Sequence, residues 1–396
     1  MMKSIIPALA LLIILNTANQ AYAQAKDSIA EKYIFTKVID LPASPVKDQY
    51  ASGTCWSFAT TSFIESELIR LTKDTFDLSE MYFARKAYEA KAKQFVRLHG
   101  TANFGQGGQA HDVMNIVKTS GIMTEADYSG LANGQTKPSH SELEAVLTAM
   151  VGALAKNPGG KLSPEWSNAI SAVLDVYMGQ VPASGSNPAK AELLKKINPD
   201  DYVEITSYSH HPYYSKFILE VPDNWSDNVY YNVTPDELVQ IMDYSLEKGY
   251  TIAWDGDVSD KGFSHKNSVA IVPEVNIDKI TGTEKSKWEK LTEKERKAQF
   301  YSFEKPVPEK NITTEMRQAA FDDFSATDDH LMHITGTVTD QNGKRYFKTK
   351  NSWAPDSNSN GGYLNISEAY IRLNTIAIMV NKDAIPKEIR KKLELK

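Results

Sequence analysis

The pattern of apolar and polar positions changes character about halfway along the chain. Up to about residue 200 the apolar residues recur at helical spacing, and from about residue 201 they follow the shorter period of β-strands. The longest helical pattern begins at Cys55 and carries two apolar stripes, formed by Ala59, Phe63, Ile64, Leu68 and Leu71. Two stripes predict a helix that is buried on more than one side, with Thr54 or Ser52 as its N-cap.

Residues 140–180 predict two further helices, each with one apolar face. The first face consists of Leu143, Leu147, Met150 and Leu154. The second helix begins at the start signal Ser163-Pro164-Glu165 and carries Trp166, Ile170, Val173 and Tyr177. We interpret residues 131–200 as a helical insertion whose main role is packing.

Six strands are predicted in the second half, at residues 250–254, 268–272, 332–339, 345–351, 362–366 and 375–380. Residues 284–297 predict a mixed-charge surface helix with Trp288 and Leu291 as its apolar contacts. The pattern as a whole predicts an α+β fold. Its parts are a targeting segment (1–23), a helical lobe (24–130), the helical insertion (131–200) and a β-rich lobe that ends in a short helix (201–396).

The first 23 residues have the pattern of an export signal. Lys3 provides a positive charge, residues 5–15 provide an apolar core, and Ala21-Tyr22-Ala23 provides a cleavage site. Because the apolar run is short for a bilayer span, cleavage is favoured over retention as a membrane anchor. We therefore expect a bacterial protein that is periplasmic or extracellular, with no membrane contact after cleavage.

Composition and charge exclude some classes of partner. A chain of 396 residues that is 41% hydrophobic and 24% charged resembles an ordinary globular protein and can form two packed cores. The net charge of −6 gives no reason to expect binding to nucleic acid. The single cysteine of an exported chain cannot form an intramolecular disulfide, so catalysis is the leading explanation for it.

Cys55 has the sequence context of a nucleophile. It opens the long helical pattern, where backbone N–H groups and the helix dipole are expected to lower the pKa of a thiol. Gln49 lies six residues upstream and can donate to an oxyanion together with the backbone N–H of Cys55. A buried, unreactive thiol at the start of a core helix is the alternative.

A nucleophilic cysteine needs a base and a third group that orients the base. A hairpin with the three-residue turn 341–343 places His333 opposite Asn351 on one face of the sheet, whereas a two-residue turn places His333 opposite Ser352. We take the first register, with His333 as base, Asn351 as orienting group and Trp353 as a cover over their hydrogen bond. His330 is set aside because it should point to the opposite face of the strand.

Three other motifs carry weaker signals. Gly107 and Gly108 belong to a glycine-rich stretch that either lines a cleft or forms an ordinary turn. The acidic stretch 255–260 lacks the terminal glutamate of an EF-hand loop, so calcium is not expected. The pair His210-His211 has no Cys or Glu partner at ligand spacing, and we interpret it as a loop pair. No metal or organic cofactor is predicted.

Taken together, these residues resemble the papain-like cysteine peptidases. Gln49, five intervening residues, Cys55-Trp56, then His333 and Asn351-Ser352-Trp353 follow in the order of that family. The chain looks most similar to the bleomycin hydrolase/aminopeptidase C branch. Cys55 and His333 are 278 residues apart, against roughly 130–150 in papain and the cathepsins. Three segments also look like those of bacterial members, namely His211-Pro212-Tyr213-Tyr214, residues 221–225 and residues 254–259.

The resemblance implies a papain-like two-lobed fold with helical insertions and a Cys-His-Asn acyl-enzyme mechanism. It assigns Cys55 as nucleophile, His333 as base, Asn351 as orienter and Gln49 as oxyanion donor, with Gly107, Gly108 and Trp353 at the substrate. It implies peptide substrates, an aminopeptidase and a homo-oligomer as a possible assembly.

One departure leaves the cleavage mode open. Members of the branch carry a C-terminal arm that enters the cleft, and this sequence stops about where the arm would begin, so an endopeptidase with an open cleft is an alternative. A catalytically silent peptide-binding protein, and a transferase or amidase that uses the same acyl-enzyme, are the other rivals.

Overall fold

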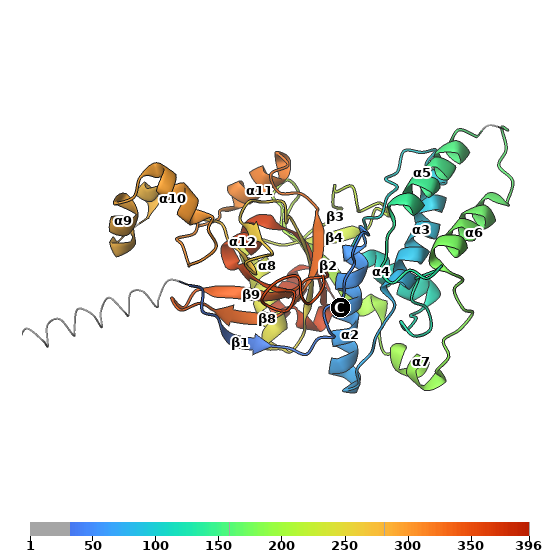
Figure 1. The fold of residues 1–396 in the computed structure, drawn as a ribbon, viewed down its shortest axis with the longest axis horizontal. Coiled ribbons are helices and arrows are strands. Elements are labelled where there is room, and N and C mark those ends of the chain that lie inside the picture. The colour runs from blue at the N-terminus through green and yellow to red at the C-terminus, as the bar shows by residue number, and fades with distance from the viewer. Residues whose placement is uncertain (1–31, 158, 281, 396) are drawn as a thin grey trace, which may run out of the picture.

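The computed structural model describes residues 32–157, 159–280 and 282–395. The chain forms two lobes, with helix α2 (Cys55–Thr72) running between the sheet of one lobe and the other helices (Figure 1). The expected targeting segment, residues 1–23, lies outside the described residues. Within the described part of the chain, no helix is both long and apolar enough to cross a membrane.

Helix α2 is buried around its circumference, as its two apolar stripes predicted. Every residue from Cys55 to Leu68 is buried, whereas Leu71 at the end of the helix is 39% exposed. Thr54 occupies the predicted N-cap position, but its side chain makes no cap hydrogen bond to the helix. The first-turn N–H groups of α2 are therefore not saturated by a capping side chain.

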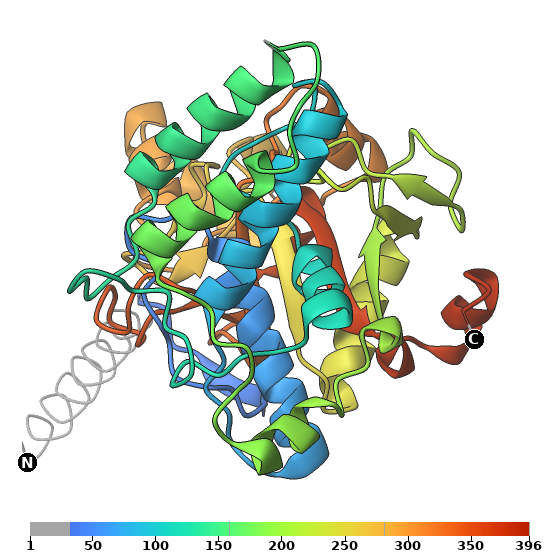
Figure 2. The same cartoon turned by 90° about the vertical axis from the view of Figure 1, so that its right-hand side faces the viewer.

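The helical lobe has a single core. Its helices are α3 (Glu80–Arg97), α4 (Ala110–Ser120), α5 (Ser141–Ala155), α6 (Trp166–Met178) and α7 (Pro188–Leu194). In Figure 2, α5 and α6 lie across α3, and their buried residues belong to the same apolar cluster as those of α2 and α3. The predicted insertion is thus continuous with the lobe. The buried face of α6 is formed by Ile170, Leu174 and Met178.

The β lobe is built on one sheet with the strand order β3-β4-β2-β11-β5-β8-β9-β10-β7-β6, and β1 pairs with β8. The strands are β1 (Thr36–Asp40), β2 (Tyr202–Thr206), β3 (Lys216–Ile218), β4 (Val229–Asn232), β5 (Ile252–Gly256), β6 (Phe263–Ser264), β7 (Val269–Ala270), β8 (His330–Thr339), β9 (Arg345–Lys350), β10 (Tyr363–Ser367) and β11 (Thr375–Asn381). One face of the sheet packs on α2, and the other is covered by α8 (Pro235–Glu247), α12 (Glu368–Asn374) and α13 (Lys387–Lys392).

All six predicted strands are present, but several elements were missed. Strand β1 pairs with β8, so the stretch assigned to the helical lobe begins in the sheet of the β lobe. Helices α8 and α11 (Thr314–Asp322) were also missed, although Thr234 and Glu237 form a capping box at the start of α8. The predicted surface helix 284–297 is split into α9 (Gly282–Glu289) and α10 (Glu293–Phe300). Trp288 stacks on Phe300 between them.

The β8–β9 hairpin contains a bulge that changes which residue of β9 lies opposite His333. Its turn is the predicted three-residue connection, because the Asp340 N–H donates to the Lys344 carbonyl and Gly343 has a φ of 78°. From Thr339 back to Gly336 the strands pair in the predicted register. A bulge between Ile334 and Gly336 then shifts the register by one residue, which the sequence did not reveal.

Candidate active site

Cys55 lies at the first position of α2, next to the start of β8. Its side chain accepts a hydrogen bond from the backbone N–H of Leu331, which follows His330. The thiol is buried, with 8% of the residue exposed. The thiol of the nucleophile expected from the sequence therefore lies against the backbone of the residue that follows His330.

The pKa of Cys55 is raised to about 12, opposite to the sequence expectation. Burial is the largest cause because it disfavours the thiolate, and the Leu331 N–H only partly offsets it. The carboxylates of Asp223, Asp328 and Asp255 raise the pKa further. The free protein therefore holds a neutral thiol, and attack on a substrate requires that the thiol proton be transferred.

His330 and Asn351 form a buried hydrogen-bonded pair. His330 Nε2 lies 2.7 Å from Asn351 Oδ1, and both residues are buried. Because the amide oxygen accepts, Nε2 carries the proton and Nδ1 is the basic nitrogen of the ring. Burial lowers the pKa of His330 to about 4, while the Asn351 hydrogen bond opposes that shift. The imidazole is therefore neutral and able to accept a proton near neutral pH.

His333 does not pair with Asn351, so this assignment from the sequence is wrong. The bulge in β8 places His333 opposite Lys350, one residue short of Asn351. Its Nδ1 lies 2.8 Å from Ser62 Oγ in the middle of α2, and burial followed by the charge of Lys350 lowers its pKa. A fully buried histidine between two packed elements cannot reach a substrate.

His333 is part of an interlobe polar cluster, which we define as Ser44, Ser62, Glu65, His333 and Lys350. The Lys350 Nζ donates to Ser62 Oγ at 2.7 Å and to Ser44 Oγ at 3.0 Å. The Ser44 hydroxyl in turn donates to the Glu65 carboxylate. Burial lowers the pKa of Lys350 to about 8. The cluster links α2 to β8 and β9 through polar groups.

Trp353 covers the site as the sequence predicted, although over a different histidine. Its ring centroid lies 4.8 Å from that of His330 and 4.8 Å from that of His265. His265 was not considered from the sequence. Its Nδ1 lies 3.3 Å from Asn351 Nδ2, so it holds the other end of the orienting amide. Contact between Trp353 and a substrate stays a prediction.

Gln49 is fixed beside Cys55 by hydrogen bonds to both lobes. Its Oε1 accepts from the Ser352 hydroxyl at 2.6 Å, and its Nε2 donates to the Ser52 carbonyl at 2.8 Å. One amide hydrogen remains for a further acceptor. The Cys55 backbone N–H, at the first turn of α2, is the second donor that could face the same acceptor. This arrangement fits the oxyanion role that the resemblance assigned.

The glycine-rich stretch lies against the nucleophile helix. The Trp56 Nε1 donates to the Gln106 carbonyl at 2.9 Å, and a methyl group on Gly108 would press on the Trp56 ring. A methyl group on Gly107 would overlap the carboxylate of Asp223. These glycines therefore allow a close approach of the chain to Trp56 and to an acidic side chain.

Three acidic side chains lie on one side of the site. Asp223 and Asp328 are partly exposed, and Asp255 is buried behind them. Neither carboxyl oxygen of the buried Asp255 has a hydrogen-bond partner among the described residues, and the charge of Asp328 adds to the causes that raise the pKa of Asp255. Burial raises the pKa of both, that of Asp328 to about 7, and the Gln109 amide donates to Asp328 at 2.7 Å. The sequence analysis did not identify these residues.

Comparison with known families agrees with this geometry. A family model described as papain family cysteine protease matches residues 37–181, which include Gln49, Cys55 and the glycine-rich stretch. A second model, described as Peptidase C1-like family, matches residues 299–396, which include His330 and Asn351. The two matches fall on the two sides of the candidate site.

Two individual proteins give the same result. A probable cysteine protease, RD19B from Arabidopsis thaliana, is 31% identical over 107 residues, which are 26% of this chain and 29% of that protein. The chain thus spans less than a third of that relative. The crystal structure of PepW from Lactobacillus rhamnosis HN001 superposes with a TM-score of 0.68 at 17% identity. The match covers 100% of this chain and 96% of that one, which shows a shared fold.

Proposed function

We propose that the chain is a papain-like cysteine peptidase, that it hydrolyses peptide bonds through Cys55, His330 and Asn351, and that it acts on the free N-terminus of its substrates. The observation that supports catalysis is the His330–Asn351 pair beside a cysteine held by the Leu331 N–H. The observation that supports an aminopeptidase is the acidic side of the site, formed by Asp223 and Asp328.

Acylation begins when His330 Nδ1 takes the Cys55 proton and the sulfur attacks the carbonyl carbon of the substrate. Gln49 Nε2 and the Cys55 N–H stabilise the resulting oxyanion. The intermediate collapses when the C–N bond breaks and the imidazolium gives its proton to the leaving amine. A thioester on Cys55 remains.

Deacylation repeats these steps with water. His330 removes a proton from the water as it attacks the thioester, and the thiol regains its proton when the C–S bond breaks. Asn351 keeps the ring in the orientation that both half-reactions use, because its oxygen fixes the proton on Nε2. Neither step requires a metal or an organic cofactor.

The free amine of a substrate suits the charges around the nucleophile. An N-terminal residue occupies the position next to the scissile bond, so its ammonium lies a few ångströms from the sulfur. Asp223 and Asp328 are near enough to Cys55 to raise its pKa, and a bound ammonium offsets both charges. A substrate with a blocked amine brings no positive charge to these carboxylates and leaves the buried Lys91 as the counter-charge of Asp223, so the site favours aminopeptidase cleavage.

The test uses two fluorogenic peptides that are identical except for an acetyl group on one N-terminus. Wild type, Cys55→Ala and Asp223→Asn are assayed on both, with Asp74→Asn as a matched control on the loop after α2. We expect cleavage of the free-amine peptide, its loss in Cys55→Ala, a higher KM in Asp223→Asn and no change in Asp74→Asn. Equal cleavage of both peptides would indicate an endopeptidase, and cleavage of neither would favour a binding protein.

We also propose that the protein acts outside the cytoplasm. The proposal is supported by the charged, apolar and small-residue order of residues 1–23. Fractionation of cells that express the full chain, followed by N-terminal sequencing of the mature protein, tests both export and the cleavage site.

A further inference from the structure

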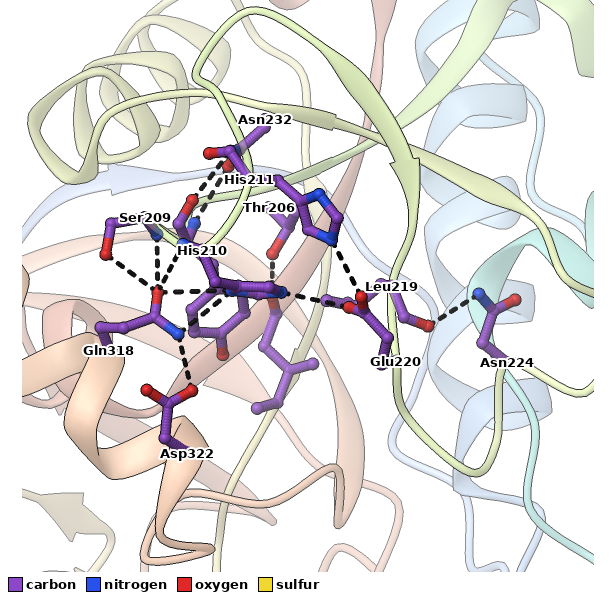
Figure 3. A network of polar contacts seen from close by, with 12 residues as sticks. Thr206, Ser209, His210, His211, Leu219, Glu220, Asn224, Asn232, Gln318 and Asp322 are labelled. Atoms are coloured by element: carbon purple, nitrogen blue, oxygen red, sulfur yellow. Dashed lines mark hydrogen bonds and ion pairs between the residues drawn. The ribbon is translucent and has the colours of Figure 1, made fainter.

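A second group of metal-ligating side chains lies outside the active site, on the β lobe. His210 and His211 precede β3 and Glu220 follows it, and one ligand atom from each lies within 4.8 Å of the others. His210 Nε2 is 3.1 Å from one oxygen of Glu220, and His211 Nε2 is 2.9 Å from the other. Figure 3 shows both imidazoles directed at this carboxylate. The pair lies in a loop, as the sequence predicted, but the expectation that it has no glutamate partner is wrong.

We propose that His210, His211 and Glu220 bind one divalent transition-metal ion, with zinc the best match. Two imidazole nitrogens and a carboxylate form a donor set that Zn²⁺ uses when water fills its fourth position. Tetrahedral ligands at bond lengths of about 2.0–2.1 Å are roughly 3.3 Å apart. The two nitrogen–oxygen distances, which involve different oxygens of Glu220, fall a few tenths of an ångström short of that value, whereas the three ligand atoms as a set lie within 4.8 Å of one another. The three side chains must therefore draw together around an ion.

The two imidazole rings are held in place without a metal. His211 stacks on Phe217 with centroids 4.1 Å apart, and His210 stacks on Phe321 at 5.5 Å. The second ring nitrogen of His210 faces the Gln318 amide, at 3.1 Å from Nε2 and 3.4 Å from Oε1. With a metal on Nε2 the ring proton is on Nδ1 and must be donated to Gln318 Oε1, and such an acceptor is the usual way in which a ligating histidine is oriented.

The backbone that carries the three side chains is held by two asparagines, which Figure 3 also shows. Asn232 Nδ2 donates to the carbonyl of His211 at 3.0 Å, and Asn224 Nδ2 donates to the carbonyl of Leu219 at 3.1 Å, next to Glu220. The donor atoms are therefore positioned in advance, which lowers the entropy cost of binding. The side chains stay accessible, with 27%, 34% and 56% exposure for His210, His211 and Glu220.

An ion at this position would also restrain the segment that borders the cleft. Glu220 is three residues before Asp223, and Asn103 Nδ2 binds both the Pro222 carbonyl and the Asp223 carboxylate. Asp223 in turn lies against Gly107. The metal would connect the loop before β3 to this segment, so its binding should reduce the mobility of residues 219–226.

The test measures Zn²⁺ binding by calorimetry on tag-free protein in a Cys55→Ser background, because the active-site thiol is itself a zinc ligand. We expect one Zn²⁺ per chain, with affinity at least tenfold weaker in Glu220→Gln and in His211→Asn. His99→Asn is the matched control, since His99 is exposed elsewhere and asparagine tolerates its φ of 56°. Gln318→Leu should weaken binding roughly tenfold while it leaves all three ligands in place.

Cobalt provides an independent readout. Co²⁺ in a site with three protein ligands should give the visible absorption bands of tetrahedral coordination, and Glu220→Gln should abolish them. Melting curves without metal show whether each variant is folded. The proposal is overturned if folded Cys55→Ser protein binds no Zn²⁺ at millimolar concentration, or if Glu220→Gln and His211→Asn bind it as tightly as their parent.

Discussion

Two matched substitutions test the proposal that His330, and not His333, is the general base. His330→Ala removes the imidazole that binds Asn351, and His333→Gln removes the imidazole that contacts Ser62 but keeps a hydrogen-bonding side chain there. Both histidines are buried, three residues apart on β8. The comparison therefore separates a role in chemistry from a role in packing.

The expected magnitudes differ strongly between the two variants. Loss of a general base typically lowers the rate 10²- to 10⁴-fold, so kcat/KM of His330→Ala should fall by that factor, which is about 3–5 kcal/mol of transition-state stabilisation. In His333→Gln we expect kcat/KM within a few-fold of wild type. Its free energy of unfolding should fall by about 1–2 kcal/mol, because a buried hydrogen bond is perturbed.

The assay measures kcat/KM on the free-amine peptide per mole of folded protein, with the folded fraction taken from urea unfolding of each variant. A folded His330→Ala enzyme with near wild-type turnover would refute the assignment. So would a folded His333→Gln enzyme with a loss of 10²-fold or more.

Three further predictions follow from the site. Cys55→Ala should abolish turnover on every peptide and leave the urea midpoint close to that of wild type. Gly107→Ala should raise KM for the free-amine peptide by displacing Asp223, which steady-state kinetics on both peptides will show. For the free-amine peptide, kcat/KM should rise through pH 7 as Asp328 ionises and fall above about pH 8 as the substrate amine loses its proton. The acetylated peptide, and Asp328→Asn with either peptide, should lack the rise through pH 7, so that the acid limb moves to near pH 4, where His330 becomes protonated. The fall above about pH 8 should persist in Asp328→Asn with the free-amine peptide.

The parts of the fold that depend on local patterns were predictable. Helix α2, the hairpin turn and all six proposed strands follow from periodicity and turn chemistry close in sequence. The bulge between Ile334 and Gly336 was not predictable, because β8 is also paired with β1, which lies almost the length of the chain away. Gly336 has no side chain where the Ile39 carbonyl crosses it, and a single sequence does not show that crossing.

The same limit applies to the site. Cys55, Gln49 and Asn351 were identified because their spacing and neighbours are local signals. The choice between His330 and His333 depended on the register beyond the bulge. His330 was excluded because residues three apart on a regular strand point to opposite faces, and that reasoning did not allow for a bulge. A lowered thiol pKa was predicted from the position of Cys55 at a helix end, which is a local signal. Burial by the other lobe raises this pKa, and that burial cannot be recognised from the local sequence.

The interlobe polar cluster has a consequence for how the two halves of the enzyme can be recombined. If α2 slid along β8 by even one residue, the ammonium of Lys350 would lose the Ser62 hydroxyl, and a buried polar group left short of a hydrogen bond costs about 1–3 kcal/mol. The cluster thus stabilises one alignment of the two lobes over alignments that are shifted by a residue. A chimera that takes one lobe from a distant relative should keep the spacing between nucleophile and base only if matching polar partners are transferred with it.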